Sequence, residues 1–364
     1  MKETHPFFKE KISPFLRKKI SEFKENYGEH STQYIALSLQ YIRGPLEAVG
    51  GNEANIKHYE AGVHVEIDHS SVPGLERLYK RTLVIEPTLI CASHCRYCLR
   101  QNYSKHTLTE AQLFDIAKYC GEPERRDILN EVLITGGDPL LLPQRMNILI
   151  QALLTHAPNI KTVRIGTRLM TQSPDKFDSE VFSLFKDKPG IRFEIATQLN
   201  HPAEFFPETC EIFKRLQGLG IKIYSQNVLL KGINDNVETL IELYNEMRLH
   251  DIEAHYLFHC VPIRGIHHLR TSVDKGLELM RCLSSGGFIS GRAKPMYAAM
   301  TDIGKIVFYE GTIASRKDGW LLLKSGYRLK DRFAWNPTWR LPENAATDEA
   351  GFLQVWYLDG DDGN

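Results

Sequence analysis

Three cysteines stand close together in the segment CASHCRYC, at positions 91, 95 and 98 of the 364-residue chain. Thiolates at such spacing bind zinc or an iron–sulfur cluster, and four of them would complete either kind of site. The segment has no fourth cysteine, and His94 lies between two of the three, where its geometry as a zinc ligand would be poor. Three thiolates on a four-iron cluster leave one iron free to bind a substrate or a cofactor. We therefore predict a [4Fe–4S] cluster on Cys91, Cys95 and Cys98, ahead of a zinc site.

Strand and helix patterns alternate along the middle of the chain. Apolar runs, each followed by an amphipathic helical pattern, occupy residues 82–87, 131–137, 162–167, 192–198, 222–230 and 254–260. This alternation predicts an α/β fold with a parallel sheet covered by helices. Six units predict a partial (β/α)6 barrel rather than a closed eightfold one, with an open sheet as the alternative. Active residues should lie at the C-terminal ends of the strands, where CASHCRYC follows the first one.

The chain divides into three predicted parts. Residues 1–75 form a helical N-terminal region whose last third is polar and irregular. Residues 76–300 hold the barrel. Residues 301–364 form short strands with Gly-rich turns, which we expect to close the barrel over a cofactor or to join subunits. The acidic end LDGDDGN is expected to be frayed.

A second motif, ITGGDPL, ends the second predicted strand with Gly136, Gly137 and Asp138. Two glycines at a strand end allow a ligand to approach the backbone closely, although glycines are also common in ordinary turns. Its position places this motif beside the cysteine segment at the same end of the sheet.

Further segments follow in a fixed order: SSVPGL, CRYCLR, GGDPLLL, VRIGTR, NHPAE, QNVLLKGIND and GIHHLRT. Together with the C-x3-C-x2-C spacing, they make the chain resemble the lysine 2,3-aminomutase family of the radical S-adenosylmethionine (SAM) superfamily. The resemblance covers residues 70–325, most of the chain. It implies a partial barrel with helical N-terminal material and C-terminal strands.

The resemblance also implies an activity. Enzymes of this family are isomerases that move an α-amino group to the neighbouring carbon, with a [4Fe–4S] cluster, SAM and pyridoxal phosphate (PLP) as cofactors. SAM provides an adenosyl radical that removes a hydrogen, and PLP holds the amino group. The expected partners are a small-molecule amino-acid substrate, an electron donor such as flavodoxin or ferredoxin, and further copies of the chain in a homo-oligomer.

Individual residues take roles from the matching motifs. Lys305, in DIGKIVFY, falls where the family has the lysine that holds PLP, a task that needs a primary amine. Arg100 matches the arginine for the substrate carboxylate, which a guanidinium can bind with two hydrogen bonds. The Gly-Gly-Asp motif matches the element that holds the amino group of SAM. Further cofactor contacts are implied for Arg168, Asn200, His201, Gln226 and Asn227.

The sequence also departs from the family pattern. Val261 stands where the lysine-using enzymes have an aspartate for the distal ammonium group, and Arg264 follows it. Arg77 and Arg81 sit one residue away from the positions of the arginines that hold the cofactor phosphate. These differences favour a glutamate-like substrate over lysine and leave PLP open. The family's C-terminal metal-binding cysteines are absent, so we expect no structural zinc.

Composition narrows the class of protein further. The chain has 45 Lys+Arg and 45 Asp+Glu, so the charge balance does not indicate nucleic acid or an anionic membrane as a partner. It has no apolar run of the ~20 residues needed to span a bilayer and no signal-peptide pattern at its start. We therefore expect a cytoplasmic protein.

Two other functions fit parts of this pattern. The first is a radical SAM enzyme of the same fold that acts without PLP or on a residue within a peptide or protein. The second is a non-catalytic iron–sulfur or zinc protein, against which the intact GGD, NHP and LLKGIND segments argue.

Overall fold

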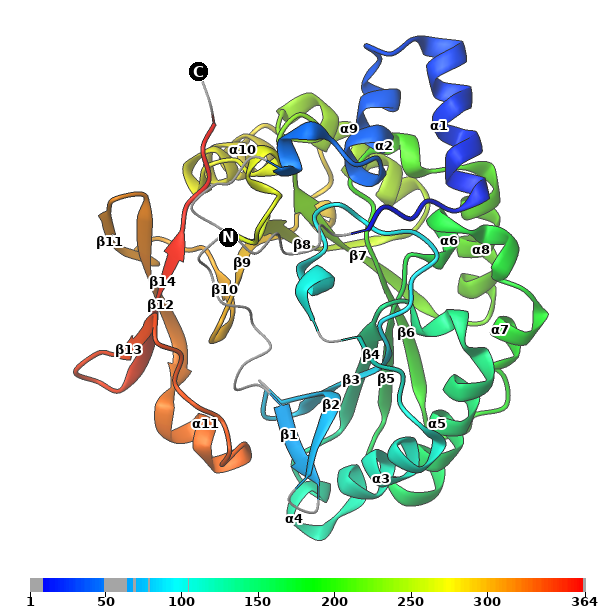
Figure 1. Cartoon of the computed structure of the whole chain (residues 1–364), viewed down its shortest axis with the longest axis vertical. Helices are drawn as coiled ribbons and strands as arrows, with labels where there is room; N and C mark the ends of the chain where they lie inside the picture. The colour runs from blue at the N-terminus through cyan, green and yellow to red at the C-terminus, as the bar shows by residue number, and fades with distance from the viewer. Residues whose placement is uncertain (1–8, 49–63, 68–69, 78, 104, 363–364) are drawn as a thin grey trace, which may run out of the picture.

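A curled sheet of ten strands forms the centre of the molecule (Figure 1). The computed structural model describes residues 9–48, 64–67, 70–77, 79–103 and 105–362. Seven neighbouring strands are parallel: β3 (Thr82–Thr88), β4 (Glu131–Gly136), β5 (Thr162–Gly166), β6 (Arg192–Thr197), β7 (Lys222–Leu229), β8 (Glu253–His259) and β9 (Met296–Thr301). Antiparallel strands extend both edges: β1 (His64–Ile67), β2 (Ser70–Glu76) and β10 (Gly304–Val307). The predicted partial barrel is confirmed, and β9 adds a parallel strand to the six expected.

Helices cover the outer side of this sheet. The longer ones are α3 (Glu110–Gly121), α5 (Pro143–His156), α8 (Pro207–Gly218), α9 (Val237–Leu249) and α10 (Val273–Ser285). The short ones are α4 (Pro123–Arg126), α6 (Leu169–Gln172) and α7 (Ser179–Ser183), with 3-10 turns η3 (Leu99–Asn102), η4 (Pro139–Leu141), η5 (Pro174–Lys176), η6 (Pro202–Glu204), η7 (His267–Leu269) and η8 (Gly291–Ala293). Figure 1 shows these helices on the outside of the curled strands.

Local sequence explains where these helices begin and which face they bury. Helix α9 begins after Asn236, whose side chain accepts a hydrogen bond from the backbone N–H of Thr239. Its buried residues recur at helical spacing: Leu240, Leu243, Tyr244 and Met247. The strands show the complementary pattern, because in β4 and β5 buried residues alternate with partly exposed ones. The outward face is buried under helices, and the inward face keeps access to solvent.

The two ends of the chain add to this barrel. Helices α1 (Pro14–Tyr27) and α2 (Thr32–Tyr41) and the turn η1 (Pro45–Ala48) lie beside the strands' C-terminal ends (Figure 1). A second, antiparallel sheet follows β10 in the order β11–β12–β14–β13. Its elements are β11 (Ile313–Lys317), β12 (Trp320–Arg328), α11 (Leu329–Trp335), β13 (Ala345–Thr347) and β14 (Phe352–Leu358). None of the described helices is long and apolar enough to cross a membrane.

Two sequence expectations about these ends are wrong. The stretch read as irregular contains β2, which pairs with β3 in spite of its Pro-Gly pair. The acidic C-terminal tail is docked as far as Asp362: Asp359 accepts a hydrogen bond from Val273 N at the start of α10 (2.7 Å), and Asp362 accepts one from Ser272 N (2.7 Å). The tail thus supplies acceptors to the free N–H groups at a helix N-terminus, which explains why it is ordered.

Candidate active site

The cysteine segment is a loop that leaves the C-terminal end of β3 and packs on the Gly-Gly-Asp motif. Gly137 N donates to Thr88 O and Asp138 N donates to Ile90 O, each at 2.7 Å. A Cβ on Gly137 would lie 2.3 Å from the carbonyl oxygen of Ile90. Gly136 has a φ of +105°, and a Cβ there would lie 2.7 Å from Thr88 O. Glycines are therefore needed at positions 136 and 137, because the backbone of the cysteine loop packs directly against them. Their contact with a bound ligand stays a prediction.

Asp138 is buried and faces the end of the next strand. Its carboxylate accepts hydrogen bonds from Thr167 Oγ1 at 2.8 and 2.9 Å and from Arg168 N at 2.9 Å. Burial raises the pKa of this carboxyl to about 6, although the hydrogen bonds from Thr167, Arg168 and Leu140 act in the opposite direction. In this structure Asp138 thus ties β4 to β5.

The three cysteine thiols are neighbours with limited access to solvent. Burial is the main cause that raises the pKa of Cys91, and the charges of Cys98 and Cys95 add to it. Burial likewise raises the pKa of Cys98 to about 11, again with a contribution from Cys95. In the described ranges no three His, Cys, Asp or Glu side chains are close enough to hold one metal ion. Thiolates that each bind a different iron of a cluster lie farther apart than the ligands of a single ion, and the assignment of the three thiols to a cluster stays a prediction.

The N-terminal region holds the cysteine loop through contacts that no sequence motif predicted. His94 N donates to Lys11 O and Arg96 N donates to Gln40 O, each at 2.8 Å. Arg96 and Glu47 form a buried ion pair with Nε–Oε1 at 2.9 Å and Nη2–Oε2 at 2.5 Å. Residues from three separate N-terminal segments therefore position the backbone between the cysteines.

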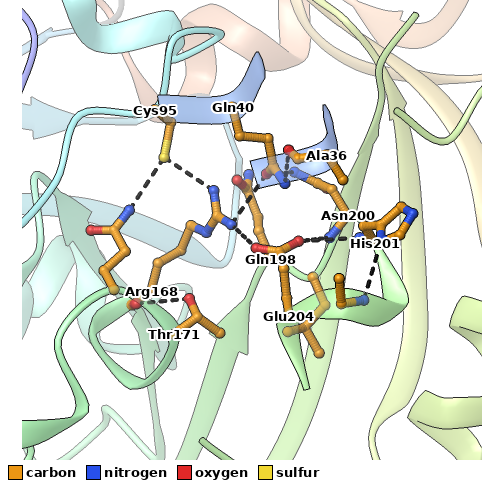
Figure 2. A network of polar contacts seen from close by, with 12 residues as sticks. Ala36, Gln40, Cys95, Arg168, Thr171, Gln198, Asn200, His201 and Glu204 are labelled. Atoms are coloured by element: carbon orange, nitrogen blue, oxygen red, sulfur yellow. Dashed lines mark hydrogen bonds and ion pairs between the residues drawn. The ribbon is translucent and has the colours of Figure 1, made fainter. Parts of the chain in front are cut away.

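Arg168 lies at the centre of a buried polar network beside Cys95 (Figure 2). Its Nη1 donates to the sulfur of Cys95 at 3.1 Å and also to the hydroxyl of Tyr97. Its Nη2 forms an ion pair with Glu204. Gln172, from α6, gives Cys95 a second donor, with its Nε2 3.3 Å from the sulfur. Of the residues around Cys95 only Arg168 was singled out from the sequence; Tyr97 and Glu204 lie within the matched segments CRYCLR and NHPAE but were given no role, and Gln172 lies outside the matched segments.

Asn200 and His201 join the same network from the end of β6. Asn200 Nδ2 donates to Tyr97 (2.6 Å) and to Gln40 (3.1 Å), and its Oδ1 accepts from Val228 N (2.8 Å). His201 Nδ1 accepts from the backbone of Ala203 at 3.1 Å, and burial lowers the pKa of this histidine to about 4. In this structure Asn200 connects separate elements of the fold, whereas His201 caps the turn η6, and a contact of either residue with a cofactor stays a prediction.

Gln226 and Asn227 point to opposite sides of β7. Gln226 is partly exposed and follows the inward-facing Tyr224 by two residues. Asn227 is fully buried, donates to the carbonyl of Leu199 and lies 3.9 Å from the sulfur of Met247 in α9. The predicted cofactor contact of Asn227 is thus at odds with its position in the helix-covered layer, whereas Gln226 keeps a place on the inward face.

Lys305 lies inside the barrel, on β10. Its Nζ is 4.6 Å from the ring centre of Tyr256, 5.6 Å from that of Tyr79 and 5.9 Å from that of Phe258. Burial lowers the pKa of Lys305 to about 8, and the charge of Arg164 lowers it further. At pH 7 an amine with this pKa is uncharged in about a tenth of the molecules, far more than for an ordinary lysine, and the uncharged form is the nucleophilic one.

The cations near the barrel already have partners. Arg164, on the inward face of β5, pairs with Glu131 and lies 3.7 Å from Glu194. Arg77 is buried and donates to Tyr119 of α3 at 3.4 Å, and so lies in the outer layer. Arg81 is exposed and donates to Asn130 at 3.4 Å.

Two predicted substrate residues stand near the cysteine loop. Arg100 forms an ion pair with Glu86 of β3, whose side chain is only 1% exposed. The same arginine lowers the pKa of Cys98 against the larger effect of burial, so it lies close to that thiol. Val261 is buried, and Arg264 is exposed while its carbonyl accepts from Gln101 at 2.9 Å.

Comparisons with known proteins agree with the resemblance predicted from the sequence. Residues 85–244 match the Radical SAM superfamily. The chain is 34% identical to a putative L-lysine 2,3-aminomutase of Aquifex aeolicus, over 65% of this chain and 64% of that protein. It is 32% identical to a glutamate 2,3-aminomutase of Clostridioides difficile, over 61% of this chain and 52% of that protein. It is 29% identical to the L-lysine 2,3-aminomutase of Fusobacterium nucleatum, over 64% of this chain and 54% of that protein. The chain thus matches less than two thirds of the length of each of these relatives.

Proposed function

Because this chain carries a radical SAM domain and is related to lysine and glutamate 2,3-aminomutases, we propose that it is itself an amino-acid 2,3-aminomutase. Its cofactors would be a [4Fe–4S] cluster on Cys91, Cys95 and Cys98, SAM beside that cluster, and PLP on Lys305. An electron donor of the flavodoxin or ferredoxin type and a homo-oligomeric assembly belong to the same proposal.

The observation that carries this proposal is the position of Lys305. The lysine lies on the inward face of the same barrel whose first loop carries the three cysteines. Its amine has a lowered pKa and is surrounded by aromatic faces. Lys305 is half-buried, and partly withdrawing a charge from water without a partner is costly. Attachment of an aldehyde cofactor supplies a reason for this position.

Each of the chain's own groups has a defined task. When bound, the cluster with SAM supplies a carbon radical that removes a hydrogen atom, and PLP holds the migrating amino group. Lys305 presents its uncharged amine to the aldehyde, and Tyr256 and Tyr79 offer flat faces to a pyridine ring. Arg100 holds the substrate carboxylate if it exchanges its pairing with Glu86 for that anion.

The phosphate of PLP is the part with the weakest fit. Arg77 and Arg81, near the family's phosphate-binding positions, make their contacts with Tyr119 and Asn130 instead. Arg164 is the inward-facing cation whose charge acts on Lys305, and we assign the phosphate to it. For this task its pairing with Glu131 must weaken when the cofactor binds.

The substrate we propose has a neutral or acidic side chain, with glutamate ahead of lysine. A distal ammonium group would need carboxylates around it, and position 261 offers a buried valine. One relative of the chain is named a glutamate 2,3-aminomutase. Arg264 lies in the loop that follows β8, three residues beyond Val261, and is the residue we assign to a distal carboxylate.

Reductive labelling tests the central residue. Protein incubated with PLP and then borohydride should carry the pyridoxyl group on Lys305, located by mass spectrometry of the digest. The yield should rise with a midpoint near pH 8, because the lowered pKa leaves the amine uncharged above that pH. Lys324→Ala, which removes an exposed lysine of β12, should label normally, and Lys305→Ala should not. Labelling at other lysines, or none in folded protein, would contradict the assignment.

A second function has one specific observation in its favour. The outward and surface positions of Arg77 and Arg81 leave the phosphate without the two arginines expected from the family. A radical SAM enzyme that works without PLP, or on a residue of a peptide or protein, would not need them. Absence of labelling together with reductive cleavage of SAM would select this function.

A further inference from the structure

Cys95 differs from the other two cluster cysteines in its surroundings. Its sulfur accepts hydrogen bonds from two side chains, Arg168 Nη1 at 3.1 Å and Gln172 Nε2 at 3.3 Å (Figure 2). In the described part of the chain, the sulfurs of Cys91 and Cys98 receive no side-chain hydrogen bond. The loop thus exposes one of its three sulfurs to a cationic and a neutral donor.

The two donors are held in place from behind. Arg168 is 8% exposed, and its guanidinium also contacts Glu204, Tyr97 and Gln40. Gln172 is 2% exposed, and its Oε1 accepts from Ser93 N at 3.2 Å, which fixes the direction of its amide group. Neither side chain can turn away from the sulfur without breaking buried hydrogen bonds, which costs about 1–3 kcal/mol for each group left unsatisfied.

Donors at a ligand sulfur change the energy of electron uptake by a cluster. When the cluster takes one electron from its donor protein, the added negative charge is shared between the irons and the sulfurs. N–H groups that point at a sulfur, and a nearby positive charge, stabilise the reduced form more than the oxidised form. Glu204 offsets part of the charge of Arg168, so the hydrogen bonds to sulfur should carry much of the effect.

We propose that Arg168 and Gln172 are positioning residues that raise the reduction potential of the cluster through the sulfur of Cys95. This inference rests on the cluster of the proposed function and on neither PLP nor the substrate. On this proposal, the network of Gln40, Tyr97, Asn200 and Glu204 holds the guanidinium of Arg168 in place against the sulfur of Cys95.

The test is a redox titration of the anaerobically reconstituted protein, followed by the electron paramagnetic resonance signal of the reduced cluster. Gln172→Leu removes one donor, and the pair Arg168→Gln with Glu204→Gln removes the other without leaving an unpaired carboxylate. We expect the double substitution to shift the reduction equilibrium at least tenfold toward the oxidised form, which for one electron is about 59 mV more negative. Gln172→Leu should shift the reduction potential in the same direction by a smaller amount. The potential of Arg168→Lys should lie between those of the parent and the double variant.

Arg270→Lys is the matched control, because Arg270 is buried like Arg168, at 1% exposure, but donates to the carbonyls of Cys260, Leu358 and Asp359. The reduction potential of the cluster in Arg270→Lys should equal that in the parent protein. Unchanged potentials in both Gln172→Leu and the double variant, with full iron content, would overturn the inference. A folded Gln172→Leu protein that holds no cluster would also overturn it, because the donor would then serve binding rather than potential. Absence of a cluster in the parent protein would instead contradict the proposed function.

Discussion

The ion pair between Arg96 and Glu47 offers a direct test of how the cysteine loop is held. Both side chains are buried, at 1% and 7% exposure, and the pair joins the loop to the N-terminal region through two hydrogen bonds. Glu47→Ala leaves the guanidinium buried without its carboxylate. Removing one partner of such a pair costs about 3–5 kcal/mol, a large part of the ~5–15 kcal/mol that stabilises a typical protein.

The measurement is the free energy of unfolding from urea titrations of parent and variants, followed by circular dichroism. Glu22→Ala is the control, because Glu22 is partly exposed at the protein surface, forms long pairs with Lys18 and Lys19 at 3.6 Å, and its loss should cost less than about 1 kcal/mol. Replacing both partners, Arg96→Met with Glu47→Leu, should recover most of the loss, since no buried charge remains. Iron content after reconstitution should fall in Glu47→Ala and recover in the double variant. A Glu47→Ala protein as stable as Glu22→Ala would refute the reasoning.

Two further predictions concern the cluster. Cys95→Ala should abolish reductive cleavage of SAM, because each thiolate binds one iron. Cys282→Ala, which changes an exposed cysteine of α10, should leave cleavage unchanged. Normal cleavage in Cys95→Ala, measured by chromatography of 5′-deoxyadenosine, would contradict the ligand assignment. Gly137→Ala should reduce the iron content severalfold, because its Cβ would meet the loop backbone at 2.3–2.6 Å. Gly218→Ala is the control and should leave the iron content unchanged, because a Cβ at position 218 has no atom within 4 Å. Equal iron content in the two proteins would show that the loop can shift.

Most of the barrel could be predicted from the sequence because each strand is a short stretch rich in apolar and β-branched residues, followed by a helical pattern. Buried parallel strands need apolar side chains on the helix-covered face, and residues 82–87 and 131–137 show this plainly. Strand β9 was missed since MYAAMT has no Val or Ile, and a loop with Gly and Pro separates it from α10. Strand β2 was missed because Pro and Gly in SSVPGLE indicate a turn, but pairing with β3 outweighs that local preference.

The candidate site could be predicted only where spacing along the chain carries the signal. Cys91, Cys95 and Cys98 belong to one loop, so eight residues suffice to identify them. The environment of Cys95 could not be predicted, because its donors come from residues 168 and 172, more than seventy positions away. The same applies to the tail, whose order depends on contacts with α10 far from it in the sequence.

Product analysis tests the central claim most directly. The protein, reconstituted anaerobically with iron and sulfide and supplied with SAM, PLP and a reductant, is incubated with glutamate and, separately, with lysine, and the products are identified by NMR. We predict the β-amino acid from glutamate in excess of that from lysine, none from Lys305→Ala or Cys95→Ala, and a reduced yield from Arg264→Ala. Cleavage of SAM without any β-amino acid from either substrate would contradict the aminomutase proposal, and efficient turnover of lysine unaffected by Arg264→Ala would contradict the proposed distal site.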